Sequence, residues 1–119
     1  MLRMLAIIFG IAFIFAGVAG FLPSFTRDGL LFGFFEVNAM QNIVHLLSGV
    51  FAIMAATRFG YAKLYFRLFG CFYALITIAG FTMHGILMMH FNMADNLVHL
   101  VIALFALYLG FFTRRKAAY

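Results

Sequence analysis

The chain has 119 residues, enough for one domain, and 67% of them are hydrophobic while only 9% are charged. A water-soluble domain of this size needs far more polar surface, so the composition excludes an ordinary soluble fold. The net charge of +5 comes from basic residues at the ends of apolar segments, not from a basic patch, which excludes nucleic acid as the expected partner.

Four apolar segments follow one another along the chain, each close to the roughly 20 residues that a membrane-spanning helix needs. They cover residues 4–22, 38–58, 64 to between 84 and 90, and 94–112. Pro23 stops the first, and we expect a tight turn at Arg58, Gly60, Lys63 and Arg67 between the second and third. The sequence therefore predicts an all-α, polytopic membrane protein, a four-transmembrane-helix bundle in one domain over residues 1–119.

The basic residues predict the orientation of this bundle. Seven of the eight lie before the first segment, between the second and third, or after the fourth, and these are Arg3, Arg58, Lys63, Arg67, Arg114, Arg115 and Lys116. Only Arg27 lies on the other side. Because basic residues stay in the cytoplasm, we expect both termini to be cytoplasmic and the protein to be a multi-pass protein of the bacterial inner membrane.

Two parts of the sequence recur. Residues 8–21 align with residues 68–81 at an offset of 60, and residues 38–52 align with 92–106 at an offset of 54, where both copies read Asn-x-x-x-Asn-x-Val-His-Leu. This pattern predicts an internal two-fold repeat of helices 1–2 and 3–4, with halves 1–58 and 59–119 related by an axis along the membrane normal. Because the first segment recurs as a later span, we expect it to be a span and not a cleaved signal peptide.

A polar stripe is repeated on the second and fourth segments, at spacings that fall on one helix face. It comprises Asn38, Asn42, His45, Asn92, Asn96 and His99. Polar side chains that face lipid are costly, so the stripe should turn inward or toward a partner protein. One interpretation is structural: each imidazole bonds an asparagine or a carbonyl on a neighbouring helix, with Asn42 and Asn96 as partners or helix caps.

A second interpretation is ligation. Paired His45 and His99 could hold a haem iron, or a metal such as copper together with His84 or His90 at the outer end of the third segment. A third is a quinone, lipid or small-molecule pocket between the helices. The repeat leaves open whether the two histidine rings face each other.

Small residues are expected to let helices approach closely, among them Ala12, Ala16 and Gly20 in the first segment. Catalysis is poorly supported, since the carboxylates are limited to Asp28, Glu36 and Asp95. No nucleophile-and-base arrangement is evident, so an enzyme is the less favoured interpretation.

Two motifs and the stretch between them resemble a known family. They are Asn42-x-x-His45-Leu46-Leu47-x-Gly49, Lys63-Leu64-Tyr65-Phe66-Arg67-x-x-Gly70 and Asp95-Asn96-x-x-His99-Leu100. This pattern is similar to that of a bacterial family of four-span membrane proteins catalogued as domain of unknown function 4383. The resemblance covers about residues 38–109 and implies fold and location without an activity. This chain departs from it at Ala103, where the family tends to carry a second glycine.

The small size, the short loops and the lack of catalytic groups favour a non-catalytic accessory or assembly subunit of a larger inner-membrane complex. The alternatives are a haem- or metal-binding protein that uses His45 and His99, and a homo-oligomer that binds a lipid or a quinone between protomers. Haem or copper is the cofactor to consider, and no cofactor is the favoured expectation. The expected partners are membrane lipids and either another membrane protein or a second copy of the chain.

Overall fold

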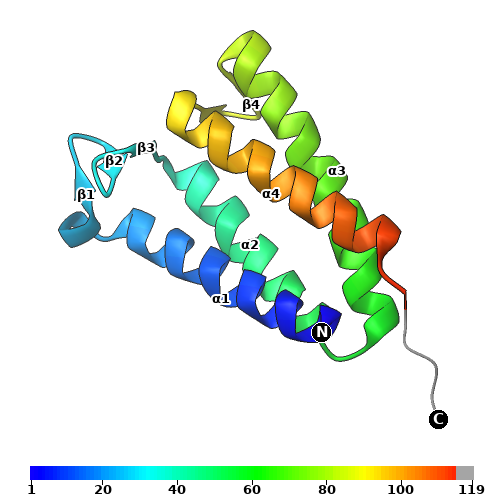
Figure 1. Cartoon of the computed structure of the whole chain (residues 1–119). Helices are drawn as coiled ribbons and strands as arrows, with labels where there is room; N and C mark the ends of the chain where they lie inside the picture. Colours follow the sequence, from blue (N-terminus) through cyan, green and yellow to red (C-terminus); the bar gives the residue numbers. More distant parts are fainter. Residues whose placement is uncertain (115–119) are drawn as a thin grey trace.

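A computed structural model shows four α-helices joined by short loops, and it describes residues 1–114 (Figure 1). The helices are α1 (Leu2–Phe21), α2 (Ala39–Ala55), α3 (Phe59–Met83) and α4 (Met93–Phe112). Between α1 and α2 lie the 3-10 helix η1 (Pro23–Phe25) and the antiparallel strands β1 (Thr26–Arg27), β2 (Leu30–Leu31) and β3 (Phe35–Glu36). The hairpin β4 (Gly85–Ile86) and β5 (Met89–His90) joins α3 to α4.

The mostly helical prediction is confirmed. Within residues 1–114, three helices (α1, α3 and α4) are long and apolar enough to cross a membrane, while α2 is an apolar helix of 17 residues. Large apolar side chains such as Leu75 and Val101 are exposed along the helices, as they are in proteins whose solvent is lipid. The chain is therefore consistent with a helical membrane protein. The two-residue strands in the loops were not predicted.

The tight turn expected at Arg58, Gly60, Lys63 and Arg67 is wrong. The turn ends at Arg58, and Lys63 and Arg67 lie within α3. Both side chains reach the C-terminal end of α4, where Lys63 Nζ donates to the Thr113 carbonyl (2.7 Å) and Arg67 Nε donates to the Gly110 carbonyl (2.6 Å). A cation bonded to the unpaired carbonyls at a helix end is favourable, so these residues stabilise α4 from inside α3.

The third helix also ends earlier than expected. Its C-cap is His84, whose φ of 61° lies in the left-handed region and stops the helix. His90 consequently lies on strand β5 and not on the helix. The Arg115 and Lys116 side chains, which contributed to the predicted orientation, lie outside the described residues.

The helices pair into two hairpins, because α1 packs mainly against α2 and α3 packs mainly against α4. Backbones approach closely within a hairpin: a Cβ added at Gly49 would lie 2.7 Å from the Gly10 carbonyl oxygen. Near the N-terminus the two hairpins meet around a buried cluster that includes Ala6, Ala52 and Phe66. They spread apart toward the other end of the molecule (Figure 1).

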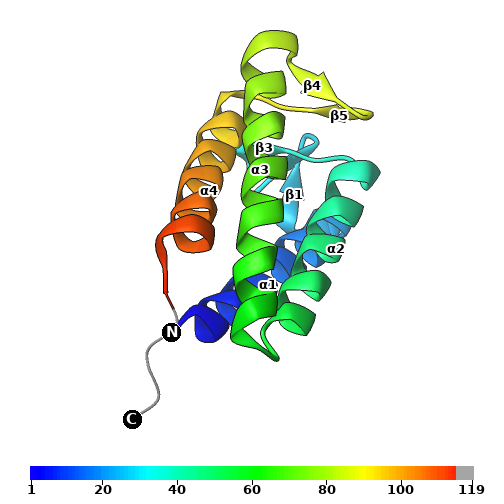
Figure 2. The same ribbon diagram turned by 90° about the vertical axis from the view of Figure 1, so that its right-hand side faces the viewer.

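At this spread end each hairpin is tied to the loop of the other. Asn38 caps α2 by accepting from the Gln41 backbone N–H, and its Nδ2 donates to the Met88 carbonyl (3.0 Å). Asn92 caps α4 and its Nδ2 donates to the Phe34 carbonyl (2.8 Å). The β4–β5 hairpin thereby reaches across to the start of α2 (Figure 2).

Three further hydrogen bonds reinforce these contacts. Gln41 Nε2 donates to the His90 carbonyl (3.1 Å), and Asp95 Oδ2 accepts from the backbone N–H of Glu36 (3.1 Å) and of Asn92 (2.9 Å). Side-chain bonds to loop backbone fix the loops relative to the helices. The spacing of α1 from α4 is thus set at the end where the candidate site lies.

Candidate functional site

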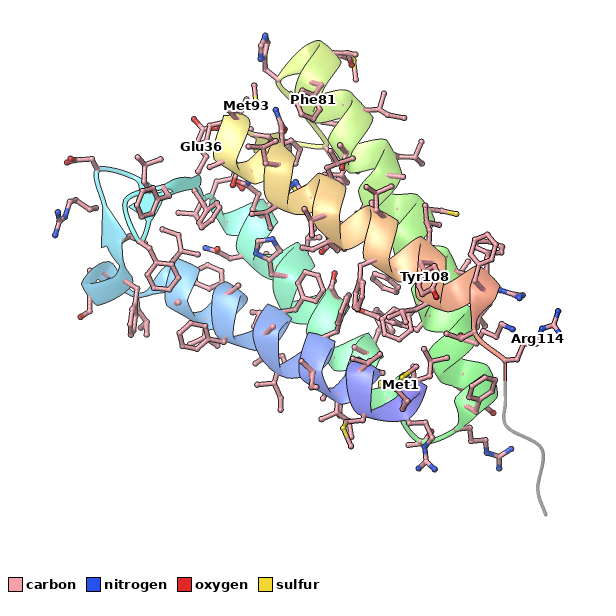
Figure 3. All side chains as sticks on the ribbon, viewed as in Figure 1. Met1, Glu36, Phe81, Met93, Tyr108 and Arg114 are labelled. Carbon is pink, nitrogen blue, oxygen red and sulfur yellow. The ribbon has the colours of Figure 1, made fainter. Side chains whose placement is uncertain are left out.

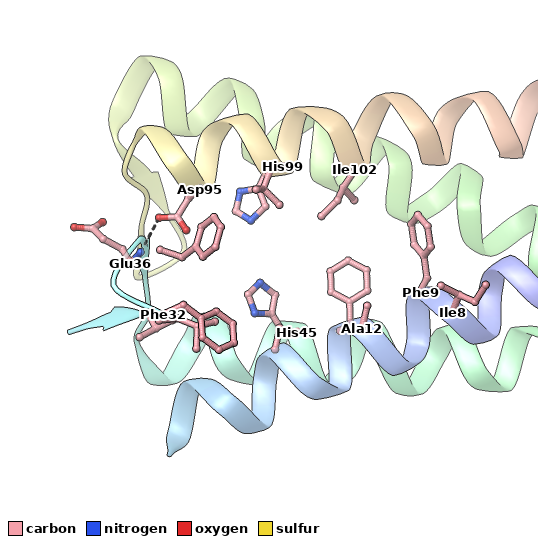
Figure 4. A pocket seen from close by; sticks show the side chains of 15 residues that line it. Ile8, Phe9, Ala12, Phe32, Glu36, His45, Asp95, His99 and Ile102 are labelled. Atoms are coloured by element: carbon pink, nitrogen blue, oxygen red, sulfur yellow. Dashed lines mark hydrogen bonds between the residues drawn. The ribbon is translucent and has the colours of Figure 1, made fainter. Parts of the chain in front are cut away.

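A cavity of about 340 Å³ lies between the two hairpins, on the side of α1 and α4. Its walls come from α1, the loop that leads into α2, one residue of α2, and α4 (Figure 4). The lining is mostly apolar, with two imidazoles and two carboxylates: Ile8, Phe9, Ala12, Phe13, Ala16, Leu31, Phe32, Phe35, Glu36, Val37, His45, Asp95, Val98, His99 and Ile102.

His45 from α2 and His99 from α4 point toward one another across this cavity (Figure 4). The His99 side chain is only 6% exposed. Phe13 lies 6.0 Å from the His45 ring, Tyr73 lies 5.6 Å from the His99 ring, and Phe13 and Tyr73 stack on each other at 5.4 Å. The structure therefore brings the predicted histidine pair together, and a continuous row of four rings holds the two imidazoles in place.

Neither imidazole makes the hydrogen bond that a structural role requires. The Nδ1 atoms of both His45 and His99 are buried without a partner among the described residues. Buried polar groups normally have a partner, so each exception calls for an explanation. The expectation that the rings bond an asparagine or a carbonyl is wrong, because the neighbouring asparagines are turned toward other contacts.

Two asparagines of the polar stripe, Asn42 and Asn96, pack against glycines of the neighbouring helix. The Oδ1 of Asn42 lies where a Cβ would stand on Gly20, and the Oδ1 of Asn96 lies where one would stand on Gly80. Glycine Cα–H groups are weak donors to such oxygens, which otherwise have no partner among the described residues. The helix caps lie one turn earlier than expected, at Asn38 and Asn92. Of the six stripe residues, the two histidines alone line the cavity.

The other two histidines are separate from this pair. His84 ends α3 and His90 lies on β5, and both side chains are exposed. Within residues 1–114 no group of three or more His, Cys, Asp or Glu side chains is arranged to hold a metal ion. The chemistry that the site offers is therefore that of two opposed imidazoles in an apolar pocket.

The cavity is open beside α1 where two of the lining residues, Ala12 and Ala16, are small. At the offset of 60, Ala12 aligns with Phe72 and Ala16 aligns with Ile76. Ile76 is buried with Met89 and in contact with Phe72, so the corresponding space beside α3 is filled. We expected the two alanines to bring helices together, but they line a cavity instead. The alignment of alanine with larger residues was the signal that could have revealed it.

The outer end of the cavity carries its acidic groups. Asp95 lies one helical turn before His99, and Glu36 lies in the loop whose backbone N–H bonds Asp95 (Figure 4). Neither residue was predicted to be part of a site. The loop that contributes Leu31 to Val37 was also missed, since its position depends on contacts between segments far apart in the sequence.

We predict that His99→Leu leaves the stability of the ligand-free protein unchanged or raises it. The buried imidazole lacks a partner, so an apolar side chain of similar size removes a desolvation cost and no bond. In contrast, Tyr73→Phe removes the bond between Tyr73 OH and Ser48 Oγ (2.9 Å) and should cost about 1 kcal/mol. Thermal unfolding in mild detergent, followed by circular dichroism, compares the two. A larger loss for His99→Leu than for Tyr73→Phe would show that the ring has a structural partner.

Comparison with known proteins identifies a family. The family model described as "Domain of unknown function (DUF4383)" matches residues 3–112, a longer stretch than the motifs alone suggested. No curated protein and no solved structure matches the chain significantly. The match covers nearly the whole chain, including all four helices and the cavity. The protein therefore belongs to the DUF4383 family, whose function is unknown.

Proposed function

We propose that the protein is a non-catalytic accessory subunit of a bacterial inner-membrane complex and that it binds a small, largely apolar ligand between its two helical hairpins. One observation carries the proposal: two imidazoles whose Nδ1 atoms have no partner among the described residues face each other in a mostly apolar cavity. Mostly apolar walls with a few convergent polar groups are the usual form of a small-molecule site. Both rings line the cavity, so a ligand there can bond the ring nitrogens that face it.

The polar groups around the cavity support binding over catalysis. Asp95 Oδ2 already accepts two backbone N–H groups, and this bonding holds the loop in place. Among residues 1–114, His45 and His99 contact aromatic rings, and the Nδ1 atom of neither ring bonds a carboxylate that would orient it as a general base is oriented. We infer that the site holds its ligand without converting it, as an accessory subunit would.

The facing imidazoles also favour a second candidate, a haem whose iron His45 and His99 would hold. The cavity of about 340 Å³ lies near the lower end of the range for small-molecule sites, which favours a compact ligand over a macrocycle. A cavity within one chain likewise favours a ligand held by one copy over one held between copies.

We further propose that all four helices span the membrane, with both termini in the cytoplasm. Met1 and Arg114 lie at one end of the molecule, and Glu36 and Met93 lie at the other (Figure 3). Arg3 donates to the Ala56 carbonyl at the same end as Arg114, which supports a basic cytoplasmic face. Helix α2 is about 25 Å long, slightly short of the hydrocarbon thickness, a mismatch that bilayers accommodate.

We also propose that the halves 1–58 and 59–119 are parallel repeats. Contacts at aligned positions support this. The Asn42 oxygen on Gly20 corresponds to the Asn96 oxygen on Gly80. In the same way, the bond from Asn38 to the Met88 carbonyl corresponds at an offset of 54 to the bond from Asn92 to the Phe34 carbonyl. Under this proposal the cavity marks the place where the two halves differ.

We predict that Ala12→Phe prevents a ligand from binding in the cavity. A phenyl ring on α1 should fill the cavity as Phe72 fills the aligned position of α3, and the protein should then retain at least tenfold less bound small molecule. Solvent extraction of the protein purified in mild detergent, followed by mass spectrometry, measures the retained molecules. Val101→Phe is the matched control, because Val101 lies exposed on α4 and outside the cavity lining.

Equal retention by wild type and Ala12→Phe would contradict a ligand site in this cavity. A Soret absorption band in the wild type, lost in both His45→Ala and His99→Ala, would replace the proposed ligand with haem.

We predict the orientation from single cysteines in a Cys71→Ser background. Phe34→Cys and Met88→Cys, each at an exposed loop position, should react with a membrane-impermeant maleimide in intact spheroplasts. Thr57→Cys, in the exposed turn between α2 and α3, should react only after lysis. Labelling of Thr57→Cys in intact spheroplasts would contradict the orientation, and failure of Met88→Cys to react would contradict spanning by α3 and α4.

A further inference from the structure

The two imidazoles restrict what can lie between them. His45 and His99 approach from opposite walls, so a molecule held by both must present hydrogen-bonding groups at two opposite edges. A neutral imidazole has one N–H donor and one ring nitrogen acceptor. Each ring can therefore donate to a carbonyl oxygen or accept from a hydroxyl group at the same place.

The charge around the cavity selects against anions. Asp95 lines the same wall as His99, one helical turn away, and Glu36 lies beside it. A carboxylate or phosphate headgroup bound between the imidazoles would be held close to the Asp95 carboxylate, and like charges repel strongly in an apolar setting. A neutral headgroup avoids this cost, so fatty acids and phospholipid headgroups are poor candidates.

The apolar walls suit a flat ring that carries a hydrocarbon tail. Phe9, Phe13, Phe32 and Phe35 supply aromatic faces and edges, which pack favourably against another ring. Ala12 on α1 opens space toward α4, and α1 packs mainly against α2. In the proposed membrane setting, a tail can leave the cavity between α1 and α4 and enter the bilayer.

Building on the proposed function, we propose that the ligand is a quinone whose two ring carbonyls accept hydrogen bonds from His45 and His99. A para-quinone is neutral, flat and apolar except for oxygens at its two opposite edges, and it carries a hydrocarbon tail in membranes. The corresponding quinol presents hydroxyl groups at the same edges, which the imidazole ring nitrogens can accept. The same two imidazoles can therefore bond either form.

The test uses the full-length protein in lipid nanodiscs and two probes with the same tail, decylubiquinone and decylbenzene. Decylbenzene has a ring and no carbonyl group. Wild type should bind decylubiquinone at least tenfold more tightly, and the double variant His45→Leu, His99→Leu should bind the two probes equally. Ala12→Phe should lose both probes, and the exposed-face control Val101→Phe should behave as wild type.

Infrared spectroscopy of bound decylubiquinone, with each carbonyl separately labelled with carbon-13, gives a second readout. Both carbonyl stretches should move to lower frequency in wild type, and His45→Leu or His99→Leu should return one of them to its unbonded position. Unshifted carbonyls, or equal binding of the two probes by wild type, would overturn the quinone assignment. If Ala12→Phe still excluded both probes, the proposed small-molecule site would stand without the quinone. If it excluded neither, both proposals would fail.

Discussion

Polar side chains in this chain are surrounded by apolar ones, where an unmade hydrogen bond is costly and water is scarce. Most of the structure follows from how that cost is met. Basic side chains of α1 and α3 bond the last carbonyls of α2 and α4, and asparagines at the opposite end cap the same helices and hold the facing loops. Each cap thus bonds two segments at once, which fixes the spacing of the hairpins as well as the helix ends.

His45 and His99 differ from the other buried polar side chains in how this cost is met. The Asn42 and Asn96 side-chain oxygens contact glycines of a neighbouring helix. The Ser48 and Tyr73 hydroxyls bond each other between α2 and α3. The histidine rings are packed by aromatic neighbours but are left without a bond partner among residues 1–114. A buried group held rigidly and left unbonded costs stability in the free protein. That cost is recovered when a ligand supplies the missing bond, which is how a binding site differs from a packing contact.

Much of the helical framework could be predicted from the sequence, because apolar length and the positions of basic residues are local properties. The histidine pair could also be found, since Asn-x-x-x-Asn-x-Val-His-Leu occurs twice. The cavity was not predicted: the difference between Ala12 and its aligned partner Phe72 is visible in the sequence, but whether it leaves an open space depends on which helices pack together. Tertiary contacts likewise decided the loops, where His84 in a left-handed conformation ended α3 and left His90 on a strand.

The proposals depend on His45 and His99 facing each other across an open cavity within one chain. The direct measurement is bridging of the pair His45→Cys, His99→Cys, in a Cys71→Ser background, by a short bis-methanethiosulfonate reagent in bilayers, read as intact mass. We expect one reagent to join both thiols of a single chain. The control pair His45→Cys, Leu97→Cys, whose second position is exposed on α4, should instead take up two separate reagents. Absence of a bridge in the first pair, or equal bridging in both, would contradict the account.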